Sequence, residues 1–147
     1  MLRTFFLINL IVCIGFASSV FALEPGDEIT LSFLDAKLQN NERIVGFEIN
    51  VTTGNIVAVG SIPEDWSLDL QPEISSKTKV SGSSRHGAGA LFTTSELPTL
   101  TIRVKKPVGG SAPKFSVKAT ILVTAEFEKT HTIELKQTEL VFRKKGI

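Results

Sequence analysis

The chain has 147 residues and a formal net charge of +1, with 42% apolar residues, 21% charged residues and one cysteine. This length suits one compact domain, a charge near zero argues against a nucleic-acid-binding protein, and the apolar content is too high for a disordered chain. A single cysteine forms neither an internal disulfide nor a cysteine-rich zinc site.

The first 22 residues have the pattern of a secretory signal peptide. Arg3 gives a positive start, residues 5–16 form an almost continuous apolar run, and small residues precede Ala22. We therefore expect cleavage after Ala22, a domain spanning residues 23–147, and a protein exported to the periplasm, the cell surface or the medium. The alternative is an uncleaved anchor, since the apolar segment is just long enough to span a bilayer. After cleavage we expect no stable membrane insertion.

Alternating apolar and polar residues predict strands along most of the domain, because successive side chains of a strand point to opposite faces. In chain order, the apolar positions of the expected strands are Ile29, Leu31 and Phe33; Val45, Phe47, Ile49 and Val51; residues 56–59; Trp66, Leu68 and Leu70; and Leu100, Ile102 and Val104. The longest alternation covers residues 115–127. Ile133 and Leu135 begin a last strand, and Leu140 and Phe142 continue it in a shifted phase, which a β-bulge near Gln137 would explain.

Eight or nine short strands separated by Gly, Pro, Asn and Ser predict an all-β fold. We expect a single antiparallel two-sheet β-sandwich of the immunoglobulin-like or jelly-roll kind, with a barrel as the alternative. Residues 108–113 are predicted to form a hairpin connection, residues 81–89 a loop, and residues 95–97 a short helical turn.

Three segments resemble strands of cohesin-type β-sandwich modules. They are residues 44–51, which contain Gly46-Phe47, residues 55–59, and residues 100–105, which read Leu-Thr-Ile-Arg-Val-Lys. Cohesin-type modules place a Gly-Phe strand early and a Thr-Ile strand with a lysine later. The resemblance covers about half of the domain. It implies a jelly-roll sandwich used for protein–protein adhesion, and it carries over no binding residue.

A loop around a histidine is the candidate interaction or structural site, formed by Arg85, His86, Gly87 and Gly89. A serine beside a histidine suggests nucleophilic catalysis, but the Gly-x-Ser-x-Gly elbow is missing. The glycines predict instead a conformational role, through positive φ angles or close packing. His131 is expected in a solvated turn. We predict no catalytic residue, no metal ligand and no cofactor.

Two groups of carboxylates are predicted to be solvated edges, because neither has the D-x-D-x-D-G spacing of a calcium loop. The groups are Glu24, Asp27 and Glu28, and Glu64, Asp65, Asp69 and Glu73. Trp66 is expected in the core together with most phenylalanines, which leaves few rings for stacking on a sugar.

Charge is uneven along the chain. Residues 23–99 carry 5 basic and 11 acidic side chains, whereas residues 100–147 carry 10 basic and 4 acidic ones. We expect strands of the two halves to interleave and neutralise each other across a sheet. The alternative is a dipolar surface that guides association with another copy or an acidic partner.

The sequence thus favours an exported, non-catalytic β-sandwich that binds a protein partner or forms part of a surface or extracellular assembly. A module that binds a glycan or another small ligand is the alternative. A small hydrolase built around His86 is the least favoured reading, and no nucleic-acid partner is expected.

Overall fold

The computed structural model describes residues 23–36, 38–39, 41–69, 78–85, 89–109, 113–125 and 129–146. Within these residues, nine strands form two antiparallel sheets. One sheet contains β1 (Glu28–Phe33), β3 (Gly54–Val59), β6 (Leu100–Val104) and β9 (Leu140–Lys144). The other contains β2 (Glu42–Thr52), β4 (Trp66–Asp69), β5 (Lys79–Ser84), β7 (Ser116–Ala125) and β8 (Lys129–Glu134). Two 3-10 turns, η3 (Thr94–Glu96) and η4 (Gln137–Glu139), complete the described elements.

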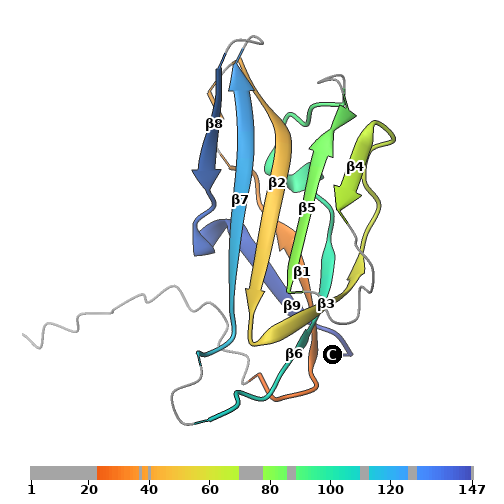
Figure 1. Ribbon diagram of the computed structural model, residues 1–147, viewed down its shortest axis with the longest axis vertical. Coiled ribbons are helices and arrows are strands. Elements are labelled where there is room, and N and C mark those ends of the chain that lie inside the picture. The colour runs from red at the N-terminus through yellow and green to blue at the C-terminus, as the bar shows by residue number, and fades with distance from the viewer. Residues whose placement is uncertain are drawn as a thin grey trace, which may run out of the picture.

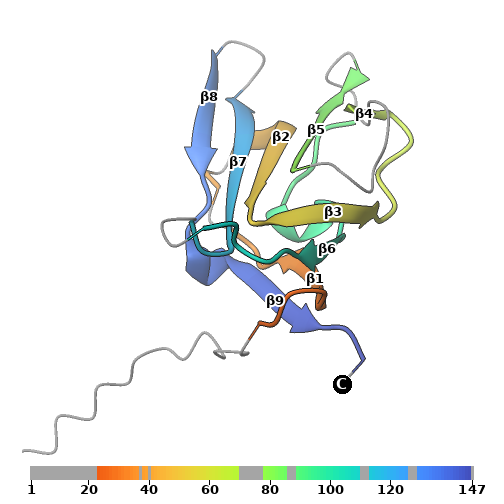
Figure 2. The same cartoon turned by 60° about the horizontal axis from the view of Figure 1, so that its bottom comes forward.

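The predicted two-sheet antiparallel β-sandwich is confirmed. The four-stranded sheet has the order β3-β6-β1-β9 and the five-stranded sheet the order β4-β5-β2-β7-β8. Figure 1 shows the five strands of the larger sheet side by side. Figure 2 shows the strands of the smaller sheet running below them at a different angle.

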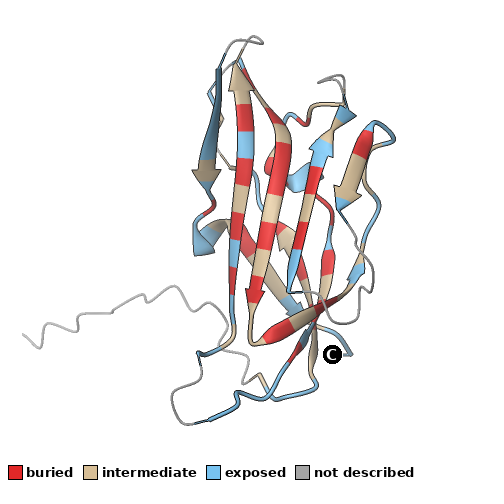
Figure 3. Ribbon diagram, in the orientation of Figure 1, coloured by how far each residue is buried: buried red, intermediate tan, exposed pale blue. Residues whose placement is uncertain are grey.

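The core lies between the two sheets and consists of the apolar sets that the alternation predicts. Its members exposed by 1% or less include Ile29, Leu31, Ile44, Leu100, Ile102, Ile121 and Val123. Burying an aliphatic side chain of this size stabilises a fold by about 1.5–3 kcal/mol. Figure 3 shows the resulting alternation of buried and more exposed residues along β2 and β7.

Trp66 belongs to the core, as predicted. It is 4% exposed and stacks on Phe47, with ring centroids 5.9 Å apart and an interplanar angle of 24°. Its indole N–H donates a hydrogen bond to the carbonyl of Gly89. The aromatic pair therefore anchors β4 and the segment at Gly89 to the centre of the larger sheet.

The structure corrects two predictions about strands. Residues 81–84 belong to β5 rather than to a loop, and their small side chains had concealed the strand. Val45 does not continue the buried set of Phe47, Ile49 and Val51, because the register between β2 and β7 shifts between Ile44 and Gly46. The bulge places Ile44 rather than Val45 in the core, while Gly46, next to Phe47, lies on the outer face.

Two predicted connections are also wrong. No bulge lies near Gln137: η4 separates β8 from β9, and these two strands belong to different sheets. The side chain of Gln137 donates to the carbonyl of Val117 at 2.9 Å, which fixes the crossing. Residues 108–113 do not join a hairpin, since β6 and β7 also lie in different sheets. The helical turn expected at residues 95–97 is present as η3, one residue earlier.

Candidate functional site

The outer face of the five-stranded sheet is rich in small hydroxyl side chains. Residues that alternate with the buried set point to this face. Cross-strand pairing places them in rows, one with Ser67, Ser83, Gly46, Leu122 and Thr132, and the next with Asp69, Ser81, Glu48, Thr120 and Glu134. The first row contains no charged residue, so the centre of the face is neutral.

This face is hollowed by two adjoining depressions of about 350 and 360 Å³, which we call the outer-face hollow. They share Ser81, Gly82 and Ser83 on β5. One depression extends over β4 to Ser67, Leu68 and Asp69, and the other extends over β2, β7 and β8 and includes Gly46, Thr120, Leu122 and Thr132.

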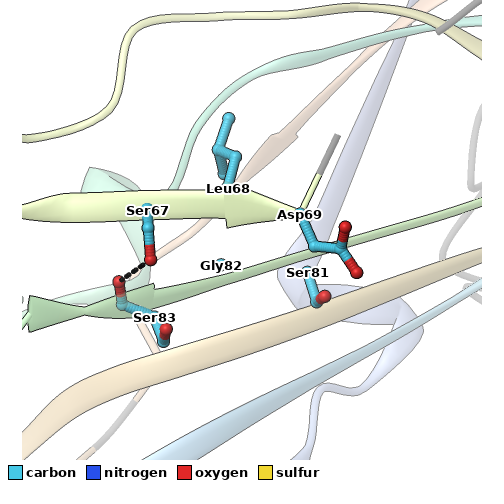
Figure 4. Close-up of a pocket in the computed structure, with 6 residues that line it drawn as sticks. All are labelled: Ser67, Leu68, Asp69, Ser81, Gly82 and Ser83. Carbon is cyan, nitrogen blue, oxygen red and sulfur yellow. Dashed lines mark hydrogen bonds between the residues drawn. The ribbon is translucent and has the colours of Figure 1, made fainter. Parts of the chain in front are cut away.

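The β4 side of the hollow presents polar groups that can both donate and accept hydrogen bonds. Figure 4 shows the side chains of Ser67, Ser81, Ser83 and Asp69 on one side of the two strands and Leu68 on the other. The Ser67 hydroxyl donates weakly to the Ser83 carbonyl, at 3.4 Å.

Two glycines of the sheet have opposite roles. A Cβ atom at Gly82 would lie 2.5 Å from Cε1 of Phe47, so glycine is required there for the ring to pack. A Cβ atom at Gly46 would meet its nearest neighbours, the Gly82 carbonyl oxygen and Leu122 Cβ, at 3.4 Å. Gly46 is therefore not required by packing, and its missing side chain leaves the hollow open.

An exposed aromatic residue lies at the margin of the same face. Phe92 is 66% exposed and follows Leu91, which forms an isolated bridge with Ile44 of β2. The Arg43 guanidinium lies over the ring, 4.5 Å from its centroid. Arg43 pairs with Thr124 of β7 on the outer face. This cation–π contact fixes both side chains, and Leu122, 37% exposed, adds an apolar group inside the hollow.

Two ion pairs lie on this face beyond its neutral central row. Lys79 Nζ is 2.7 Å from Glu48 Oε2, and Lys118 Nζ is 3.3 Å from Glu134 Oε2. The hydrogen bond from Lys79, followed by that from Asn50, lowers the pKa of the Glu48 carboxyl. The outer face thus combines an uncharged, partly apolar central row with flanking rows that carry charge, including Asp69 in the hollow.

The predicted loop site is described only in part. His86 and Gly87 lie outside the described residues. Arg85 is exposed, and its N–H donates to the Asp65 carbonyl at 2.7 Å. A Cβ at Gly89 would lie 2.7 Å from Asp65 Cβ, and Gly89 is not among the residues with positive φ. Glycine is therefore required at position 89 for close packing, one of the two expected reasons.

The prediction that His131 lies in a solvated turn is wrong. His131 belongs to β8, where it contacts a buried carboxylate. Its Nε2 is 3.2 Å from Oε1 of Glu42, whose side chain is 5% exposed. The other carboxylate oxygen accepts the Gln39 N–H at 2.8 Å. Glu42 starts β2, and β7 separates it from β8, so this contact spans three strands. Sequence spacing gave no signal for it, because 89 positions separate the two residues.

The first carboxylate group is not simply solvated. Asp27 Oδ2 lies 2.8 Å from Lys144 Nζ, while Glu28 contacts Arg103 at 2.7 Å and Lys145 at 3.2 Å. Of the second group, Glu64, Asp65 and Asp69 are exposed, and Glu73 lies outside the described residues. Among the described residues, no three His, Cys, Asp or Glu side chains are grouped so that they could hold a metal ion.

Comparison with known proteins identified no relative of this chain. No protein-family model matches the chain, and neither a curated protein nor a solved structure matches it significantly. The cohesin-type resemblance therefore stays a prediction. Within the described part of the chain, no helix has the length and apolar character needed to cross a membrane.

Proposed function

We propose that this protein is an exported, non-catalytic β-sandwich that binds a protein partner through the outer face of its five-stranded sheet. The observation that carries the proposal is the outer-face hollow, with exposed Leu122 inside it and Phe92 beside it. Export rests on the signal-peptide pattern of residues 1–22.

The composition of the face supports a protein partner. The centres of protein interfaces are depleted in charge and enriched in aromatic residues and arginine. Here Phe92 and Arg43 are already held against each other, so binding would restrict them less than it would free side chains. The short hydroxyl side chains at the centre allow another backbone to approach closely.

A glycan is the second candidate, for a specific reason. Ser67, Ser81, Ser83 and Asp69 offer hydroxyl and carboxylate groups in one depression, which suit the hydroxyls of a sugar. The face offers one exposed ring, Phe92, for stacking. A binding screen against oligosaccharides separates the two candidates, because only the second predicts saturable binding of a free glycan at the hollow.

Site-specific photocrosslinking in the producing cells tests the proposal. A photoreactive residue at Ser83 or Thr132 faces the hollow, whereas one at Thr30 or Thr101 lies on the outer face of the other sheet. We expect one discrete protein adduct from the first pair of positions and none from the second. Adducts from Thr30 or Thr101 alone would move the interface to the four-stranded sheet.

Gly46→Thr tests the hollow itself. The new Cβ fits, and the remaining atoms project into the depression, so we expect loss of the adduct without loss of stability. Ala58→Thr is the matched control, because Ala58 is exposed on β3 of the other sheet. An adduct unchanged by Gly46→Thr would contradict a role for the hollow.

A further inference from the structure

One end of the sandwich, at the bottom of Figure 1, gathers basic residues from distant parts of the sequence. The turn after β2, the end of β6, the start of β7 and the end of β9 meet here, as the pairs Thr52↔Ser116, Gly54↔Val104 and Ile29↔Lys144 require. We call this the basic end. Its cationic residues are Arg103, Lys105, Lys106, Lys114, Lys144 and Lys145, and its carboxylates are Glu24, Asp27 and Glu28. Six cations against three anions leave a net charge of +3.

Three of these lysines are free to bind an anion. Asp27 and Glu28 are occupied by Lys144, Lys145 and Arg103. By contrast, Lys105, Lys106 and Lys114 are exposed and make no ion pair within the described part of the chain. They surround one turn, because the Lys105 N–H donates to the Thr53 carbonyl at 2.9 Å and the Thr53 hydroxyl donates to the Pro113 carbonyl.

An apolar side chain extends from the same end. Val108 is 92% exposed, the highest value among the exposed large hydrophobic residues described, and it follows the exposed Pro107. Figure 2 turns this end toward the viewer. An exposed valine side chain is not stabilised by contact with water. It would be stabilised at a surface that has anionic groups on the outside and an apolar layer beneath them.

The opposite end has the reverse charge. Among the described residues, five carboxylates lie there, on Asp35, Glu42, Glu64, Asp65 and Glu96, against the cations Arg43, Arg85 and Lys129. Part of the charge asymmetry of the sequence is therefore neutralised by ion pairs between strands. The rest gives the two ends of the long axis opposite net charges. Such a dipole orients the protein in the field of an anionic surface, with the basic end toward it.

We propose that the basic end docks on anionic lipid headgroups, with Lys105, Lys106 and Lys114 at the phosphates and Val108 entering the interface between headgroups and acyl chains. The lysines would bind any polyanion, and Val108 selects the lipid surface, because a soluble polyanion offers it no apolar environment.

Vesicle co-sedimentation of the purified exported protein tests this docking. We expect much stronger binding to vesicles containing phosphatidylglycerol than to purely zwitterionic vesicles, and weaker binding as salt is raised. Each lysine near such a surface contributes a factor of about five. The triple variant Lys105→Gln, Lys106→Gln, Lys114→Gln should therefore bind on the order of 100-fold more weakly.

Two further variants make the result specific. Arg85→Gln with Lys129→Gln removes two charges from the opposite end of the molecule and should leave binding nearly unchanged. Val108→Ser should weaken binding about tenfold, whereas a polyanion site would not respond to it. Circular dichroism and thermal melting check that each variant is folded.

Equal binding to anionic and zwitterionic vesicles would overturn the proposal, and would point to a retained apolar N-terminal segment. An equal loss per removed charge in the Arg85, Lys129 variant and in the triple lysine variant would also overturn it, since binding would then depend only on total charge. Unchanged binding of Val108→Ser, with loss in the lysine variant, would assign the basic end to a soluble polyanion.

Discussion

Gly46 and Gly82 lie on neighbouring strands, and the surroundings of each explain why it is glycine. At Gly82, the Phe47 ring and the Leu68 side chain occupy the space that a Cβ would need. At Gly46, a Cβ would meet its nearest atoms at 3.4 Å, an ordinary van der Waals contact. One glycine therefore serves the core, and the other serves the outer-face hollow.

Alanine at these two positions should have opposite effects. Gly82→Ala forces Cβ into the Phe47 ring and should lower the free energy of unfolding by about 1–3 kcal/mol, a usual cost of overpacking. Gly46→Ala should leave it unchanged or raise it by about 0.5–1 kcal/mol, because alanine loses less backbone entropy on folding. Urea denaturation of both variants measures the difference. Equal destabilisation would show that Gly46 is also required by packing.

At this scale the sequence predicted the core but not the site. Bulky apolar residues at alternate positions, such as Leu100 and Ile102, can be recognised as core residues from the sequence. Phe92 does not, because the residues around it do not alternate and its exposure depends on the bridge between Leu91 and Ile44. Pairs such as Glu42 with His131 depend on strand order, which alternation does not specify.

Among the elements, β1 is an inner strand of the smaller sheet, and acidic residues at its start form ion pairs with residues of its neighbours β6 and β9. Glu28 contacts both Arg103 of β6 and Lys145 beyond β9, and Asp27 contacts Lys144. These contacts join the acidic first half of the sequence to its basic second half, so the predicted interleaving is present in this sheet.

Acid should weaken these contacts. The hydrogen bond from Lys144 and then that from the Glu24 N–H lower the pKa of Asp27 below 3.8, and those from Arg103 and Lys145 lower the pKa of Glu28 below 4.5. Because the folded-state pKa values are depressed, the stabilisation is present above the unfolded values and is lost as pH falls through the folded ones. The double variant Asp27→Asn, Glu28→Gln should therefore lose less melting temperature between pH 6 and pH 3 than the parent protein.

The exposed Glu64 provides the control, since it makes none of the ion pairs found among the described residues. Glu64→Gln should follow the parent protein in the same melting series. If the double variant also follows the parent, these surface contacts do not stabilise the fold, as is common for exposed ion pairs.

Strand positions could be predicted where side chains are large, but connections could not. β5 has only Val80 as a large apolar residue, so its sequence resembles a loop. The phase shift between Leu135 and Leu140 was visible, yet a bulge and a crossing between sheets produce the same shift. Only the partners of β9, which pairs Leu140 with Phe33, distinguish them.

For the whole molecule, the main prediction concerns the N-terminus. The pattern of residues 1–22 predicts that the exported protein begins at Leu23. In the structure Leu23 packs against the core and lines an apolar pocket of about 190 Å³ with Phe115 and Phe142. N-terminal sequencing of protein from the periplasm or medium checks the cleavage point. A membrane-bound chain that retains Met1 would favour the anchor instead.

Because β1 pairs with both β6 and β9, the smaller sheet cannot be completed until late in the synthesis of the chain. Among the described strands, β1 is made first, and its two sheet neighbours are β6 and the edge strand β9, Leu140–Lys144, which is made last. At ribosomal speeds of about 5–20 residues per second, that wait is on the order of ten seconds. During this time, Ile29, Leu31 and Phe33 of β1 lack their partner strand β9. The nascent chain is then accessible to chaperones and proteases. The smaller sheet is therefore complete only after β9 has been made.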